Sequence, residues 1–188
     1  MKIRNRYFWM VAIASTIVDI LTKKEIVRMF DLQNKQEIVR FFAVTIEQAI
    51  IYSPIPNPNK IPPTLPLIPN VFHFTYLRNS GAAFSFLAGH GGGWLAFLSL
   101  LVSIVLIVIG ITKTFNNIWE QLGFGLILAG AAGNGIDRLF FGGSVADFID
   151  VRLINFAVFN WADVSINLGI ICLLIYNFIY LPRKTNHR

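Results

Sequence analysis

The segment Gly130–Asp163 reads GAAGNGIDRLFFGGSVADFIDVRLINFAVFNWAD and sets carboxylates within runs that are otherwise apolar. These carboxylates belong to Asp137, Asp147, Asp150 and Asp163, and Arg138 lies among them. An ionisable side chain at the centre of a bilayer costs about 2.5–3.5 kcal/mol on insertion scales, so a cluster at membrane depth marks a functional site by default. We therefore interpret the rest of the chain as the frame that holds this cluster.

The composition of the 188 residues is that of an integral membrane protein, since 55% are hydrophobic, 14% are charged and the mean hydropathy is +0.60. The net charge of +6 does not indicate nucleic-acid binding, because cations gather beside hydrophobic segments at both ends and form no basic stripe with aromatics. Cys172 is the only cysteine, which excludes an intrachain disulfide and a cysteine metal cluster. The sequence holds no HExxH motif, so a zinc peptidase has no support.

Four segments are long and apolar enough to predict transmembrane helices. They lie within a single membrane domain, 1–188, at about 7–23, 94–111, 122–141 and 161–180. The first follows a basic stretch, as a cleavable signal peptide does, but its Ala-Ile-Ala triplet comes too early for a convincing cleavage site. A basic N-terminus and an even number of spans predict that both termini are cytoplasmic and that the loops 24–93 and 142–160 face outward.

The first outward loop divides into three parts. From Lys24 to about Ile51, apolar residues recur at helical spacing among charged ones, which predicts an amphipathic surface helix. Residues 52–70 hold seven of the eight prolines and predict an irregular connection. Residues 71–87 alternate apolar and polar side chains around Asn79-Ser80-Gly81, which predicts a hairpin or small sheet on the membrane surface.

The predicted topology gathers polar side chains near the outer leaflet. On the third span Asn134, Asp137 and Arg138 stand at i, i+3 and i+4, so all three project from one face. The other members come from the ends of the first and fourth spans and from the outward loops: Asp19, Lys23, Asn79, Asp147, Asn160 and Asp163.

Two carboxylates in a poorly solvated pocket tend to hold one proton between them, because each disfavours ionisation of the other. The ionised member can activate water while the protonated one donates to a carbonyl oxygen, as in aspartic peptidases. Spacing alone also permits a proton-coupled transporter or channel, a site for a hard cation, or a structural polar network. The GxGD motif of presenilin-type peptidases is matched only superficially, because an extra residue separates Gly135 from Asp137.

Five short motifs follow one another along the chain, and together they favour one of these alternatives. They are Asp19-x-x-Thr22-Lys23, Arg78-Asn79-Ser80-Gly81-Ala82-Ala83-Phe84-Ser85, Gly133-Asn134-Gly135-Ile136-Asp137-Arg138, Val145-Ala146-Asp147-Phe148-Ile149-Asp150 and Phe159-Asn160-Trp161-Ala162-Asp163. Through these motifs the chain resembles the lipoprotein signal peptidases, the type II signal peptidases of bacteria. It departs from the family pattern in a longer, more proline-rich first loop and in Val-Ala-Asp at 145–147, where the family often has Val-Val-Asp.

The resemblance implies a membrane aspartic endopeptidase that removes the signal peptide of a diacylglyceryl-modified prolipoprotein by cutting before the lipidated Cys. Together with the predicted spans, it implies an all-α integral membrane protein with four transmembrane helices, a small extramembrane β-sheet cradle and an amphipathic surface helix. Asp147 and Asp163 match the family's catalytic pair. The remaining matches bind substrate or support the pair: Asp19, Lys23, Asn79, Gly81, Asn134, Asp137, Arg138 and Asn160.

The resemblance implies no metal and no other cofactor, because a carboxylate activates the water. The expected partners are the prolipoprotein substrate and membrane lipids, without nucleic acid, and the chain is expected to act as a monomer. The expected location is the bacterial cytoplasmic (inner) membrane, with several spans, cytoplasmic termini and an active site near the outer leaflet. Asp150 is assigned a structural role in the second outward loop.

Overall fold

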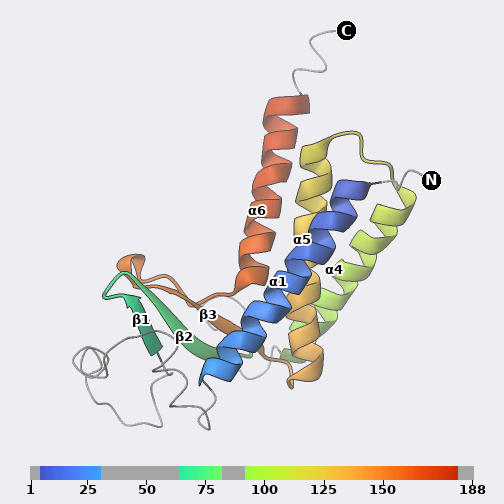
Figure 1. The fold of residues 1–188 in the computed structure, drawn as a ribbon. Coiled ribbons are helices and arrows are strands. Elements are labelled where there is room, and N and C mark those ends of the chain that lie inside the picture. Colours follow the sequence, from blue (N-terminus) through green and yellow to red (C-terminus); the bar gives the residue numbers. More distant parts are fainter. Residues whose placement is uncertain (1–4, 31–63, 82–91, 182–188) are drawn as a thin grey trace.

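The computed structural model describes residues 5–30, 64–81 and 92–181 (Figure 1). In this described part a bundle is formed by four α-helices: α1 (Arg6–Phe30), α4 (Gly92–Thr112), α5 (Ile118–Phe140) and α6 (Trp161–Ile175), the last continued by the π-helical segment η4 (Tyr176–Tyr180). Helix α5 packs against each of the other three, so it forms the centre of the bundle.

A small antiparallel sheet projects sideways from one end of the bundle (Figure 1). Its strands β1 (Thr64–Ile68), β2 (Phe72–Asn79) and β3 (Val145–Val151) pair in the order β1-β2-β3, and β3 runs into the 3-10 helix η3 (Arg152–Ile154). Strand β1 carries Pro66 at the sheet edge, where a residue without a backbone N–H is tolerated. The β2–β3 register sets Leu77 opposite Asp147, which places this carboxylate at the root of the sheet, beside the helices.

The strands differ in place from the sequence expectations. The hairpin turn lies at Asn70, whose φ of 61° is one that asparagine tolerates, and β2 ends at Asn79 instead of turning there. The segment 52–70, predicted as an irregular connection, contains β1, and the segment 142–160, predicted as a loop, contains β3. Strand β3 escapes a search for alternating polarity because it is buried on both faces, with all but two of its residues buried.

Small residues let the helices approach closely around a core that includes Phe8, Ala12, Leu106 and Leu128. A Cβ at Gly125 would meet the carbonyl oxygen of Phe8, and one at Gly133 would meet the carboxylate of Asp19. The small residues of α5 therefore lie where α1 packs.

Two helices in the described residues, Gly93–Thr112 and Trp161–Tyr180, are long and apolar enough to cross a bilayer. Helices α1 and α5 do not meet this criterion of length and apolar composition, so the arrangement of four spans stays a prediction. Helix α1 nevertheless exposes large apolar side chains, including Met10 at 63% and Ile13 at 58%. Residues 24–30 of the predicted surface helix continue α1, whereas 31–51 and the proline-rich residues 52–63 lie outside the described residues.

Candidate active site

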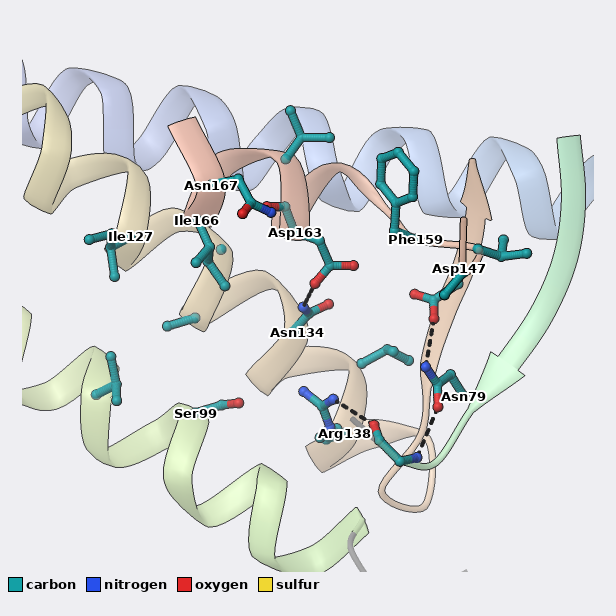
Figure 2. A pocket seen from close by; sticks show the side chains of 18 of the residues that line it. Asn79, Ser99, Ile127, Asn134, Arg138, Asp147, Phe159, Asp163, Ile166 and Asn167 are labelled. Carbon is teal, nitrogen blue, oxygen red and sulfur yellow. Dashed lines mark hydrogen bonds between the residues drawn. The ribbon is translucent and has the colours of Figure 1, made fainter. Parts of the chain in front are cut away.

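Asp147 and Asp163 line one pocket of about 680 Å³ at the end of the bundle that carries the sheet (Figure 2). Asp147 comes from β3 and is only 2% exposed, while Asp163 lies in the first turn of α6 and is half-buried. Away from the two carboxylates, the walls are largely apolar side chains of α4, α5 and α6: Leu98, Val102, Ile127, Ile166 and Leu168. The pocket therefore joins a carboxylate pair to an apolar channel between helices.

Both carboxylate oxygens of Asp147 accept hydrogen bonds from asparagine amides. Asn79 Nδ2 donates to Oδ2 at 2.9 Å, and Asn160 Nδ2 donates to Oδ1 at 2.7 Å. The Asn79 amide is oriented by the backbone N–H of Gly81, which donates to Asn79 Oδ1 at 2.9 Å (Figure 2). This chain of contacts explains why the end of β2 is part of the site.

Asp163 is held in a capping box at the start of α6. The backbone N–H of Asn160 donates to Asp163 Oδ2 at 3.1 Å, and the backbone N–H of Asp163 donates to Asn160 Oδ1 at 3.1 Å. The other oxygen, Oδ1, accepts from Asn134 Nδ2 at 2.9 Å. Asn160 is fully buried and links the two aspartates, because it caps the helix of Asp163 while its side-chain N–H groups reach Asp147 and Asn134.

Lys23 is the centre of a buried charge cluster behind the pair. Its ammonium lies 2.8 Å from Asp19 Oδ2 and 3.4 Å from Asp137 Oδ2, and it donates to Asn134 Oδ1 at 3.1 Å. Asn134 Oδ1 also accepts from Asn160. Two donors on that oxygen turn the amide nitrogen of Asn134 towards Asp163.

The two acidic members of this cluster each hold a backbone N–H next to an aspartate of the pair. Asp19 Oδ1 accepts from the N–H of Ala162 at 2.9 Å, and Asp137 Oδ2 accepts from the N–H of Ala146 at 3.0 Å. Ala162 directly precedes Asp163, and Ala146 directly precedes Asp147. The cluster thereby fixes the backbone at both aspartates.

Arg138 lines the pocket beside both aspartates and donates from Nη2 to the carbonyl oxygen of Gly81 at 3.4 Å (Figure 2). Its neighbour Asp137 pairs with Lys23 instead. Arg138 therefore ties the end of α5 to the end of β2.

The pKa of Asp147 is raised to about 7, chiefly by burial and in part by the nearby charge of Asp163. The hydrogen bonds from Asn79 and Asn160 and the charge of Lys23 oppose this rise in pKa. Near neutral pH, Asp147 is therefore poised to carry a proton.

Asp150 lies on the same strand but belongs to a different set of contacts. Its Oδ2 accepts from Thr75 Oγ1 at 2.6 Å and from Arg152 Nε at 3.0 Å. Neither partner lines the pocket, and the structural role expected for Asp150 agrees with these contacts.

All ten residues expected at the site form one connected network. Sequence reasoning missed two polar residues of the pocket wall, Ser99 and Asn167. A signal for Asn167 was present, since it follows Asp163 by four residues and so shares its helix face. Within the described residues, no group of three or more His, Cys, Asp or Glu is arranged to hold a metal ion.

Comparisons with known proteins identify relatives along nearly the whole chain. A family described as signal peptidase (SPase) II matches residues 11–179. The lipoprotein signal peptidase of Microcystis aeruginosa is 48% identical over 96% of this chain and 97% of its own length. That of Nostoc punctiforme is 43% identical over 98% of each chain. A bacterial membrane enzyme solved by the in meso method superposes with a TM-score of 0.64 at 28% identity, covering 95% of this chain and 89% of that one.

Proposed function

The chain belongs to the signal peptidase II family, and we propose that Asp147 and Asp163 are the carboxyl pair with which it removes signal peptides from prolipoproteins. The observation that carries this assignment is that both carboxylates line one pocket and each accepts N–H donors on both oxygens. Such donors hold the two groups in fixed positions while leaving further lone pairs towards the pocket. A proton-coupled transporter finds no support among the relatives.

In the proposed aspartic mechanism, Asp163 is the ionised member and takes a proton from a water molecule, whose oxygen attacks the scissile carbonyl carbon. Asp147 carries the shared proton, as its raised pKa favours, and donates it to the carbonyl oxygen. The tetrahedral intermediate then collapses: the C–N bond breaks, the proton held by Asp163 passes to the leaving amine, and Asp147 takes back a proton from one hydroxyl group as the C=O bond re-forms. The cut lies before the diacylglyceryl-modified Cys.

The proposed setting is a single membrane domain of four spans in the bacterial cytoplasmic membrane, with both termini inside and the carboxyl pair near the outer leaflet. The apolar outer faces of the helices and the sideways sheet support this setting (Figure 1). The lipid anchor of the substrate would deliver the scissile bond at the depth of the pair. Acyl-chain binding would then position the peptide without any contact at the reacting atoms.

The proposal is tested with purified protein and a diacylglyceryl-modified prolipoprotein, followed by a gel shift. Asp147→Asn and Asp163→Asn should each lower the cleavage rate by about a hundredfold or more, since a general acid or base is lost. Asp150→Asn is the matched control, because it removes a carboxylate from the same strand outside the pocket and should still cleave. Cleavage at the wild-type rate by either pair variant, correctly inserted in the membrane, would refute the assignment.

A further inference from the structure

Asn167 is a polar residue in the apolar part of the pocket, one helical turn beyond Asp163 on α6. Four residues of helix place it about 6 Å further along the axis, away from the sheet and towards the membrane interior. It is exposed and lines the same pocket as the carboxyl pair, and Figure 2 shows it on the pocket wall between Asp163 and Ile166. An amide at this position needs an explanation, because lipid offers it no hydrogen-bond partner.

The two ends of the Asn167 amide have different surroundings. The nitrogen Nδ2 donates to the carbonyl oxygen of Asp163 at 2.9 Å, within the same helix. Among the residues that the structure describes, no donor contacts the oxygen Oδ1. The group that Asn167 offers to a bound molecule is therefore a hydrogen-bond acceptor, held in orientation by its own helix.

The rest of the inner wall has few polar side chains that could accept a hydrogen bond from a bound molecule. It is formed by aliphatic side chains such as Val102 and Ile127, and the hydroxyl of Ser99 on α4 is the other polar side chain there, within the described residues. A hydrogen bond in such a poorly solvated channel is stronger than one in water. A donor on a substrate that entered the channel would therefore gain from meeting Asn167.

The substrate of the proposed reaction brings such donors. A signal peptide crosses the hydrocarbon as a helix, with its N–H groups paired internally, and attack on a peptide bond requires that helix to unwind beside the carboxyl pair. Unwinding frees backbone N–H groups on the membrane side of the scissile bond, and each unpaired group there costs several kcal/mol. An acceptor one turn deeper than Asp163 lies where those groups would emerge.

We propose that Asn167 Oδ1 accepts a hydrogen bond from a backbone N–H of the unwound signal peptide, on the N-terminal side of the scissile bond. This inference rests on the proposed function, since it assigns a substrate-binding residue within the same pocket. The ligand is the peptide backbone, so the contact selects for an extended segment and is indifferent to side-chain identity.

The test pairs a variant with altered substrates. Synthetic diacylglyceryl-modified peptides, each with one backbone amide among the four residues before the lipidated Cys replaced by an ester, are cleaved by wild type and by Asn167→Leu. Asn177→Leu is the matched control, because Asn177 makes the same bond to the carbonyl four residues earlier, at 2.8 Å to Leu173, but does not line the pocket. The readout is kcat/KM for each combination.

Asn167→Leu should lower kcat/KM for the all-amide peptide about three- to tenfold, as expected for one hydrogen bond, and Asn177→Leu should leave it unchanged. One ester should lower kcat/KM of wild type by a similar factor and leave that of Asn167→Leu unaffected, since the contact is already lost. If every ester lowers kcat/KM by the same factor in wild type and in Asn167→Leu, the inference about Asn167 is wrong, while the proposed function stands. Absence of cleavage of the all-amide peptide by wild type would overturn the proposed function, and the inference with it.

Discussion

At the scale of single residues, the proposed acid role of Asp147 predicts an upper pH limit for activity. Its pKa is raised to about 7, chiefly by burial, so the acid form that would donate to the carbonyl oxygen is depleted above that pH. We expect kcat/KM to decline about tenfold per pH unit above the folded-state pKa, because kcat/KM reports ionisations of the free enzyme. Initial rates measured between about pH 5 and pH 9 check this expectation, and a flat profile on the alkaline side would contradict it.

Lys23 neutralises part of a buried negative charge, so its replacement should lower the stability of the folded protein. Lys23→Met would remove the ion-pair partner of the buried Asp19 and Asp137, which we expect to cost about 3–5 kcal/mol. Adding Asp137→Asn should restore part of this loss, because it removes one uncompensated charge while its amide oxygen can still accept from the N–H of Ala146. Thermal melting in detergent compares the variants. A double variant that melts below Lys23→Met would contradict this view of the cluster.

At the scale of helices, Gly133 sets how closely α5 and α1 approach at the charge cluster. A Cβ at this position would overlap Asp19 Oδ2 and crowd the Cβ of Ala162. Gly133→Ala should therefore lower stability by about 1–3 kcal/mol and reduce cleavage. Gly93→Ala is the control, because a Cβ there meets no atom of the described residues within 4 Å and alanine favours a helix. Equal melting temperatures for the two variants would refute a packing role for Gly133.

The helical elements were predictable from sequence because each presents a long apolar run, and α4 and α6 were placed to within a few residues. The strands were not. In β3 the residues of both faces are buried, so its sequence does not alternate between apolar and polar residues. In β1, Pro66 indicated an irregular segment, because a sequence does not show that the strand lies at the sheet edge, where proline is tolerated. Alternating polarity identifies only strands that have one buried face and one solvent-exposed face.

The candidate members of the site were predicted from the family resemblance that the five motifs carry, but their hydrogen-bond and ion-pair partners were not. Helical spacing put Asp137 and Arg138 on one face of α5, yet it could not show that the first reaches Lys23 and the second Gly81. Those choices depend on how α1 crosses α5 and where β2 ends, which only the packed fold determines. For the same reason sequence alone did not reveal that Asp19 holds the N–H of Ala162.

At the scale of the whole molecule, the carboxyl pair lies at one end of the bundle, and the α4–α5 connection lies at the other, beside the start of α1 (Figure 1). If the basic N-terminus is cytoplasmic, the sheet must then be outside, since α1 runs from one end to the other. The orientation is tested in a Cys172→Ser background, which removes the only cysteine.

In that background we expect Asn155→Cys, at an exposed turn of the sheet, to react with a membrane-impermeant maleimide in intact spheroplasts. Asn116→Cys, in the exposed α4–α5 connection, should react only after the membrane is permeabilised. Both variants should still cleave a prolipoprotein, which shows that the labelled molecules are folded. The opposite labelling pattern would place the carboxyl pair at the cytoplasmic face, where a substrate anchored in the outer leaflet could not reach it, and would contradict the proposed setting of the enzyme.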